Sequence, residues 1–276
     1  MKICDFLEST RATLKAANIE GAQTDAEVIL AHTLERDRAW LLAHHDTILS
    51  QTELNLAQSY VNKRAGRIPM SYVLGVREFA GLEFKIDERA LTPRVETETI
   101  VAEVIKHAPQ GARVLDIGTG SGAMAIAIKY LRSDLRVIAS EVSLNALELA
   151  RENAKTLLGN DTKIEFIQSD LFDNIDGKFD VIVANLPYVT RNMDLMPEVQ
   201  NEPAVALFGG ADDGLDLYRK FFADLPDFIY NKPQVWTESD PWQQDELIKL
   251  AKTSGLTKIF KDYFILGFNK YYPKTT

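Results

Sequence analysis

Residues 114–122 constrain the fold of this chain more than any other stretch. A short apolar run, residues 114–117, leads directly into a turn that holds three glycines among five residues. The turn consists of Gly118, Thr119, Gly120, Ser121 and Gly122. Glycine suits such a turn because its backbone adopts dihedral angles that a Cβ resists, and because it lets a ligand approach closely. The pattern predicts a buried strand that opens into a helix at a ligand-binding turn.

Strand and helix signals alternate after this turn. Further strands are predicted at residues 135–139, 164–167, 179–184 and 235–237, and helices at residues 123–131, 143–158, 215–225 and 242–253. This order predicts a mostly parallel sheet with helices on both faces. The last two apolar segments, residues 257–260 and 263–268, are separated by two residues and must pair antiparallel. We therefore expect a doubly wound, Rossmann-like α/β fold of seven strands whose last strand is antiparallel.

The first third of the chain has a different texture. Residues 1–68 place apolar side chains at three- and four-residue intervals, which predicts helices at residues 5–17, 25–34, 38–43 and 52–65. Pro69, Gly75 and Gly81 then interrupt the pattern, and residues 72–74 and 82–86 alternate as short strands do. The sequence thus predicts a helical domain over residues 1–68, a β-hairpin linker over residues 69–95, and the α/β domain over residues 96–276.

Composition narrows the class of function. The single cysteine, Cys4, excludes an internal disulfide framework and a cysteine-cluster metal site, so we expect no metal. No apolar run approaches the ~18 residues that cross a bilayer, and a reducing cytoplasm fits the cysteine count best. The net charge of −9 favours a small-molecule or protein substrate, since proteins that grip duplex nucleic acid usually carry a basic surface.

The glycine turn fits two classes of cofactor. Gly118, Gly120 and Ala123 satisfy the dinucleotide fingerprint G-x-G-x-x-A, so a nicotinamide or flavin cofactor is an alternative. Glu141, at the end of the second strand, can hold ribose hydroxyls of either ligand. Asp116 favours S-adenosylmethionine (AdoMet), because its carboxylate can reach the cationic amino group of a methionine moiety and would repel a pyrophosphate.

Two further strand ends carry candidate site residues. The third strand is followed by Asp170 and Leu171, an acceptor and an apolar group suited to an adenine ring. The fourth strand ends in the tetrapeptide Asn185, Leu186, Pro187 and Tyr188.

The tetrapeptide suits transfer of a methyl group to a planar nitrogen. Such a nitrogen is a poor nucleophile because its lone pair is delocalised, and acceptors that hold both N–H groups aim that lone pair at the methyl. The Asn185 oxygen and the carbonyl of residue 186 supply the two acceptors, Pro187 fixes that carbonyl, and the Tyr188 ring offers a face to the substrate. Glu238, at the end of the fifth strand, is a further candidate to face the cleft.

These features resemble the release factor glutamine methyltransferases, the protein-(glutamine-N5) methyltransferases. The likeness covers nearly the whole chain and is most diagnostic at residues 69–79, 91–98 and 201–215. It implies that the helical domain helps dock a peptide-chain release factor. It also implies that the methyl acceptor is the amide nitrogen of the glutamine in that factor's Gly-Gly-Gln loop. Residues 118–122 and Glu141 would then hold AdoMet, Leu171 would border the adenine, and residues 185–188 would bind the glutamine.

Leu186 departs from the family pattern, which usually reads Asn-Pro-Pro-Tyr. Asn-Leu-Pro-Tyr also looks like the motif of ribosomal RNA adenine dimethyltransferases, so an adenine-N6 enzyme is the second hypothesis. Those enzymes usually begin close to the glycine turn, whereas about 110 residues precede it here. A catalytically silent AdoMet fold that only binds a partner is the third hypothesis.

Overall fold

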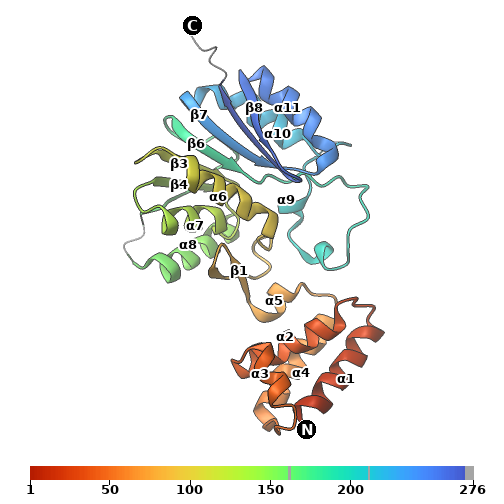
Figure 1. The fold of residues 1–276 in the computed structure, drawn as a ribbon. Coiled ribbons are helices and arrows are strands. Elements are labelled where there is room, and N and C mark those ends of the chain that lie inside the picture. Colours follow the sequence, from red (N-terminus) through yellow and green to blue (C-terminus); the bar gives the residue numbers. More distant parts are fainter. Residues whose placement is uncertain (161–162, 211, 271–276) are drawn as a thin grey trace. The chain divides into compact units, whose positions relative to one another are not determined.

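Two compact units make up the chain. The computed structural model describes residues 1–160, 163–210 and 212–270, and Figure 1 draws the elements of both units. The helical unit consists of Met1–Val76 together with Leu195–Glu202. The α/β unit consists of Arg77–Asp194 together with Pro203–Thr276. The inclusion of Leu195–Glu202 in the helical unit has no counterpart in the sequence analysis, because that segment follows the tetrapeptide and carries no helical periodicity.

The helical unit has helices at all four positions that were predicted within residues 1–68, with ends that differ by a few residues. They are α1 (Ile3–Ala16), α2 (Ala22–Leu34), α3 (Arg38–Ala43) and α4 (Gln51–Ala65). Ser50 caps the start of helix α4, because its side chain accepts from the Glu53 N–H while Glu53 accepts from the Ser50 N–H. The helices share one apolar core. Its fully buried members include Ile3, Phe6, Leu14, Ile29, Leu30 and Val61.

Residues 72–74 are helical, so the strand predicted there is wrong. They belong to α5 (Met70–Leu74), which follows Pro69 and ends at Gly75, whose φ is +78°. Met70 and Leu74 lie four residues apart and both pack on the helical core, which favours the helical period over the local alternation. The predicted hairpin instead pairs β1 (Val76–Phe79) with β2 (Leu82–Lys85).

The α/β unit contains the predicted seven-stranded sheet (Figure 1). Its order is β5-β4-β3-β6-β7-β9-β8. The strands are β3 (Arg113–Ile117), β4 (Arg136–Glu141), β5 (Glu165–Gln168), β6 (Phe179–Ala184), β7 (Ile229–Glu238), β8 (Leu256–Lys261) and β9 (Ile265–Lys270). Strand β3 pairs in parallel with β4 and β6, and β9 pairs antiparallel with β7 and β8. The Rossmann-like fold with an antiparallel last strand is therefore confirmed.

Helices cover both faces of this sheet. One face carries α7 (Ala123–Leu131) and α8 (Leu144–Leu158), with α6 (Glu98–His107) packed on α7. The other face carries α10 (Asp216–Asp224) and α11 (Gln244–Thr253), whose side chains share a core with Leu115 and Ile117 of β3. Because side chains alternate along a strand, the intervening Asp116 faces α7. The short helix α9 (Ala204–Leu207) precedes α10. Helix α6 was missed, although buried Ile100, Val101 and Val104 follow helical spacing.

Among the helices of residues 1–160, 163–210 and 212–270, none has the length and apolar character needed to span a lipid bilayer.

Candidate active site

A cavity of about 290 Å³ opens at the carboxyl ends of β3, β4, β5 and β6. It lies where the chain order reverses, since β3 has β4 on one side and β6 on the other, and ligands of open α/β sheets bind at such points. The structure brings ten of the predicted site residues to its wall. They are Gly118, Thr119, Gly120, Ser121, Glu141, Asp170, Leu171, Asn185, Leu186 and Pro187. Asp116, Gly122 and Tyr188 lie near it but are not part of the described lining.

Each glycine of the turn has a different structural task. All three have positive φ, at +71° for Gly118, +56° for Gly120 and +84° for Gly122. A Cβ on Gly122 would lie 3.1 Å from the Cβ and 3.3 Å from the Cα of Ala150, so this glycine lets the start of α7 lie close to α8. A Cβ on Gly120 would meet no described atom within 4 Å, so the backbone there faces open space. The turn therefore leaves room for a ligand at Gly120.

Glu141 is held in place by the backbone beside it. Its Oε2 atom accepts from the Gly120 N–H at 2.9 Å, and its Oε1 atom accepts from the Ser143 N–H at 3.0 Å. Burial raises the pKa of this carboxyl, and the backbone N–H groups of Ser143 and Gly120 oppose that rise. The strand end thus presents a preoriented acceptor on the cavity wall.

Asp116 lies beneath the turn. Its Oδ2 atom accepts from the Thr119 hydroxyl at 2.7 Å and from the Ala125 N–H at 3.1 Å, while its Oδ1 atom has no partner among the described residues. Burial raises the pKa of Asp116 to about 7. The carboxyl therefore ties the turn to the start of α7. Its contact with an amino group of the ligand stays a prediction.

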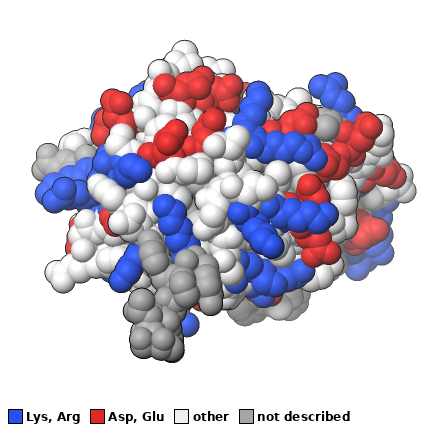
Figure 2. All heavy atoms as spheres, turned by 90° about the horizontal axis from the view of Figure 1, so that it is seen from above, with Lys and Arg blue, Asp and Glu red and all other residues white. Residues whose placement is uncertain are grey.

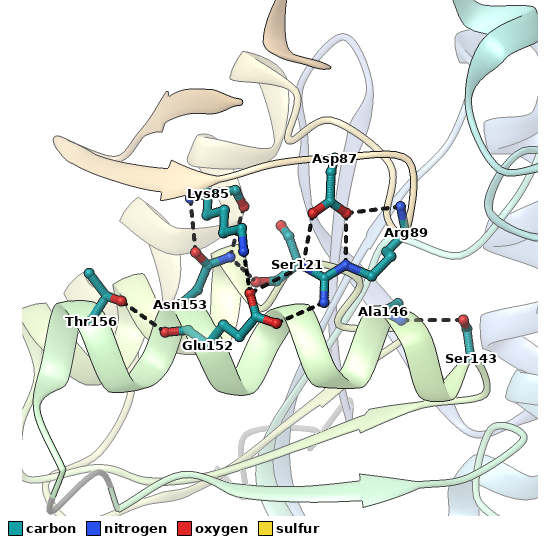
Figure 3. A network of polar contacts seen from close by, with 9 residues as sticks. All are labelled: Lys85, Asp87, Arg89, Ser121, Ser143, Ala146, Glu152, Asn153 and Thr156. Carbon is teal, nitrogen blue, oxygen red and sulfur yellow. Dashed lines mark hydrogen bonds and ion pairs between the residues drawn. The ribbon is translucent and has the colours of Figure 1, made fainter. Parts of the chain in front are cut away.

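The hairpin linker supplies one wall of the cavity. Phe79 and residues 89–94 line it. Figure 3 shows how the linker is fastened to α8 and to the glycine turn. Asn153 of α8 accepts from the Lys85 N–H at 2.9 Å, and its Nδ2 group donates to the carbonyls of Lys85 and Ser121 at 3.0 and 2.9 Å. One buried amide therefore holds the linker and the turn together.

Charged groups reinforce the same attachment at the surface (Figure 3). Arg89 contacts the carboxylates of both Asp87 and Glu152 at 2.8 Å. Lys85 lies 2.6 Å from Glu152. The hydrogen bond from Arg89, followed by that from Lys85, lowers the pKa of Glu152 to about 2. Glu152 therefore stays ionised over the whole physiological range.

The tetrapeptide is anchored from α10 and from the segment after β7. The Leu186 N–H donates to the Tyr218 hydroxyl at 3.3 Å, and that hydroxyl lies 2.5 Å from the Glu238 carbonyl. Gln243 donates to the Tyr188 carbonyl at 2.8 Å. The Leu186 side chain is buried in the core beneath Gly118, 3.3 Å from where a Cβ on that glycine would lie. The departure from the usual proline is thus accommodated by packing.

A buried polar cluster lies behind the tetrapeptide. Thr97 donates its hydroxyl proton to the Glu238 Oε2 atom at 2.6 Å and accepts from the Asn185 Nδ2 group at 3.2 Å. The Tyr188 hydroxyl donates to the other Glu238 oxygen at 3.3 Å. Thr97 was missed by the sequence analysis, because it lies 88 residues from Asn185 and 141 from Glu238. Glu238 was a candidate, and the structure places it behind Asn185, outside the described cavity lining.

Family models and solved structures agree on the class of this fold. Residues 5–75 match the PrmC N-terminal domain, and residues 96–204 match the methyltransferase small domain. A ribosomal protein L11 methylase from Lactobacillus delbrueckii subsp. bulgaricus superposes with a TM-score of 0.51 at 22% identity, covering 67% of this chain and 84% of that one. A methyltransferase from Pyrococcus furiosus gives a TM-score of 0.54 at 18% identity, covering 75% and 97%.

The fold and its cavity at the β3–β6 junction are those of an AdoMet-dependent methyltransferase. The release factor glutamine methyltransferase of Geobacter sulfurreducens is 35% identical over 92% of this chain and 89% of that protein. Its counterpart in Xylella fastidiosa strain 9a5c is 36% identical over 92% and 93%. The chain belongs to the release factor glutamine methyltransferase family.

Proposed function

We propose that this enzyme transfers the methyl group of AdoMet to the side-chain amide nitrogen of the glutamine in the Gly-Gly-Gln loop of peptide-chain release factors. The observation that carries the proposal is the anchored tetrapeptide of residues 185–188 beside the glycine turn, in a chain that aligns with its relatives over nine-tenths of its length. The helical unit, which matches the family's N-terminal domain, docks the release factor.

The residues at the cavity fit AdoMet. The open backbone at Gly120 and the preoriented Glu141 carboxylate suit the methionine moiety and the ribose hydroxyls. Asp170 and Leu171 border the adenine. Leu171 has a φ of +47°, a conformation that a branched side chain rarely adopts and that the surrounding structure must hold. Bound there, the cofactor supplies an electrophilic methyl group on a sulfonium.

The tetrapeptide prepares the acceptor nitrogen. The Asn185 oxygen and the Leu186 carbonyl accept the two N–H groups of the glutamine amide, and Pro187 restricts the backbone of Leu186. AdoMet bound in this cavity would supply the methyl group, and the two acceptors would hold the amide with its nitrogen lone pair facing that methyl group. Catalysis depends on position and on preformed hydrogen bonds. Tyr188 is tied to Glu238 through its hydroxyl, and its ring face toward the substrate stays a prediction.

A protein substrate fits the surface charge better than RNA does. The net charge is −9, and on the face drawn in Figure 2 acidic and basic side chains are interspersed. Ribosomal RNA adenine would require contacts to phosphates, which depend on clustered basic groups. The cytoplasm, where release factors act, is the expected location. Leu186 packs within the core, so its presence gives no support to a catalytically silent protein.

A methyl-transfer assay tests the proposal directly. Purified enzyme and tritiated AdoMet are incubated in parallel with a release factor, with the same factor carrying a Gln→Ala change in its Gly-Gly-Gln loop, and with ribosomal RNA. We expect one methyl group on the loop glutamine, confirmed by peptide mass, and none on the changed factor. Label recovered in RNA adenine, with an unmodified release factor, would overturn the proposal in favour of the adenine-N6 enzyme.

A further inference from the structure

An asparagine side chain can bind the substrate in two orientations with opposite consequences. Its amide oxygen accepts hydrogen bonds, whereas its amide nitrogen donates two, and rotation by half a turn exchanges the two atoms at nearly the same positions. A glutamine amide nitrogen brings N–H donors to Asn185. Only the orientation with the oxygen toward the substrate forms a hydrogen bond, and the opposite orientation sets donor against donor. The enzyme therefore needs a device that fixes this amide.

Glu238 is the first acceptor in a chain of hydrogen bonds in which the donor and the acceptor of every bond are fixed. An ionised carboxylate can only accept, so each group that contacts it must donate. Thr97 lies 2.6 Å from Oε2, a separation typical of a hydroxyl that donates to a charged oxygen. A threonine hydroxyl has one proton, and here it is used on Glu238. Toward Asn185 the same oxygen can offer only lone pairs.

Asn185 completes the chain. Its Nδ2 group donates to the Thr97 oxygen at 3.2 Å. Because that oxygen can only accept here, it selects the nitrogen of the amide. The oxygen of the same amide is then turned away from Thr97. Since Asn185 itself lines the cavity, that oxygen is the atom left for a substrate N–H.

Other contacts keep Glu238 in place. The Tyr188 hydroxyl donates to Oε1 at 3.3 Å, and burial together with the adjacent Glu238 charge raises the pKa of this tyrosine, so it stays a donor. The Glu238 carbonyl lies 2.5 Å from the Tyr218 hydroxyl. Only 2% of the Glu238 residue is exposed to solvent, so water does not compete for its oxygens.

We propose that Thr97 and Glu238 are positioning residues that orient the Asn185 amide so that its oxygen faces the methyl-accepting nitrogen. This proposal rests on the proposed methyl transfer to an amide. Protonation of Glu238 would reverse the direction of the chain, because a neutral carboxyl can donate to Thr97 and free that hydroxyl to donate to the Asn185 oxygen. The groups that face Glu238 are Thr97, Glu96, Asn185, Tyr188 and Tyr218.

The decisive variant is Thr97→Val, which keeps the side-chain shape and removes the acceptor. We expect kcat for release factor methylation to fall by about 10- to 100-fold, the loss typical when a group that orients a functional side chain is removed. The KM for release factor and the calorimetric Kd for AdoMet should each change by less than about tenfold, because Thr97 lines the cavity but valine has nearly the same shape and removes at most one polar contact. Thr97→Ser should restore most of kcat.

Thr237→Val is a matched control. Thr237 is fully buried, lies next to Glu238 on β7, and its hydroxyl has no hydrogen-bond partner among the described residues. The same chemical change there should leave kcat within about twofold of wild type. An equal loss of kcat in both valine variants, or an unchanged kcat in Thr97→Val, would overturn the proposal.

Glu238→Gln tests the direction of the chain by a separate route. In the wild type, kcat should decline on the acidic side as Glu238 gains its proton. The pH profile of Glu238→Gln should lose this one ionisation and keep only those of the cofactor-site carboxyls Asp116 and Glu141. An unchanged acidic limb would contradict the role of Glu238, even if Thr97→Val does not fold. Failure of the proposed function is distinct, since the wild type itself would then leave release factor glutamine unmethylated.

Discussion

Glu238 in the α/β unit and Glu198 in the helical unit are both shielded from solvent, yet their surroundings differ. Glu238 accepts hydrogen bonds from the neutral groups of Thr97 and Tyr188. Glu198 lies 2.8 Å from each of two guanidinium groups, those of Arg64 and Arg67. Neutral donors fix the orientation of a carboxylate and leave its negative charge uncompensated. Guanidinium groups compensate that charge. The first arrangement suits the orientation of a functional group, and the second suits attachment.

The pKa shifts of the two groups have opposite signs. Burial raises the pKa of Glu238 more than the hydrogen bonds from Thr97 and Tyr188 lower it. Burial also acts on Glu198, but the hydrogen bond from Arg64 and the charges of Arg64 and Arg67 outweigh it, and the pKa of Glu198 is lowered. At neutral pH, the ionised Glu238 therefore lowers the free energy of unfolding, and the ionised Glu198 raises it.

Glu198 fastens Leu195–Glu202 within the helical unit. Its partner Arg64 also contacts Asp25 of α2 at 2.7 Å, so one guanidinium joins two carboxylates. Asn201 adds a hydrogen bond to the Arg67 carbonyl at 3.2 Å. Ion pairs and hydrogen bonds from its side chains therefore attach Leu195–Glu202 to the helical unit.

The largest effect expected on the functional side of this comparison comes from Asn185→Ala. Loss of the oriented acceptor should lower kcat by about 10²- to 10³-fold, as removal of one preorganised hydrogen-bonding group does in other enzymes. The AdoMet Kd should rise by less than about tenfold, the limit for one lost hydrogen bond. Single-turnover assays and calorimetry measure the two quantities. An unaltered rate of methyl transfer would contradict the role of Asn185, and with it the role proposed for Thr97 and Glu238 in orienting it.

The corresponding change on the structural side is Glu198→Ala. It leaves two guanidinium groups without one of their carboxylates, and the side chain of Arg64 is only 10% exposed. We expect the free energy of unfolding of the helical unit to fall by about 2–3 kcal/mol. Urea unfolding of the full chain measures this loss, and the AdoMet Kd serves as the control that should not change. A loss below about 0.5 kcal/mol would show that the two clusters do not differ as described.

The two carboxylates should respond to pH in opposite directions. Because the folded pKa of Glu238 is raised above 4.5, wild type should lose stability relative to Glu238→Gln as the pH rises above that value. Because the folded pKa of Glu198 is lowered below 4.5, wild type should lose its advantage over Glu198→Gln as the pH falls through the lowered pKa. Each slope is limited to about 1.4 kcal/mol per pH unit. Urea unfolding between about pH 2 and 8 measures both, the Glu198 slope below pH 4.5 and the Glu238 slope above it, and slopes of the same sign would contradict the contrast.

Glu152 gives the smallest expected effect and separates charge pairing from burial. It contacts Lys85 and Arg89 as Glu198 contacts two arginines, but its side chain is 44% exposed. Glu152→Gln should therefore lower the free energy of unfolding by less than about 1 kcal/mol, and added salt should shrink the difference. A loss as large as that of Glu198→Ala, measured in the same urea titration, would mean that pairing alone accounts for the effect at Glu198.

Local sequence patterns sufficed for the parts of the site that are contiguous in the chain. The glycine turn of residues 118–122 and the tetrapeptide of residues 185–188 each follow a strand, and the parallel sheet brings both strand ends to one cavity. Thr97 and Asn153 could not be found in this way. Their partners are 88 and 68 residues distant, and only the assembled sheet and linker bring them together.

The fold was predictable for a similar reason, and its errors have physical causes. The seven strands of the α/β unit and the four helices that were predicted there, α7, α8, α10 and α11, carry strong periodicity or end in glycine and polar residues. Residues 72–74 alternate locally, but Pro69 and Gly75 bound a single helical turn whose Met70 and Leu74 both pack on the helical core. In so short a segment, packing against the rest of the unit determined that the residues form a helix and not a strand. For α6, the helical spacing of its apolar residues was present and would have been sufficient.

The segment Leu195–Glu202 has a consequence for how this enzyme can be divided. A fragment that stops at Val76 lacks the peptide that supplies Glu198 to Arg64 and Arg67, so it omits part of its own fold. Grafting the helical unit onto another methyltransferase would require two insertions, one before the catalytic sheet and one after the tetrapeptide. For the same reason, genetic recombination within the β1–β2 hairpin would join Arg64 and Arg67 of one protein to residue 198 of another, and so could lose their ion pairs with Glu198.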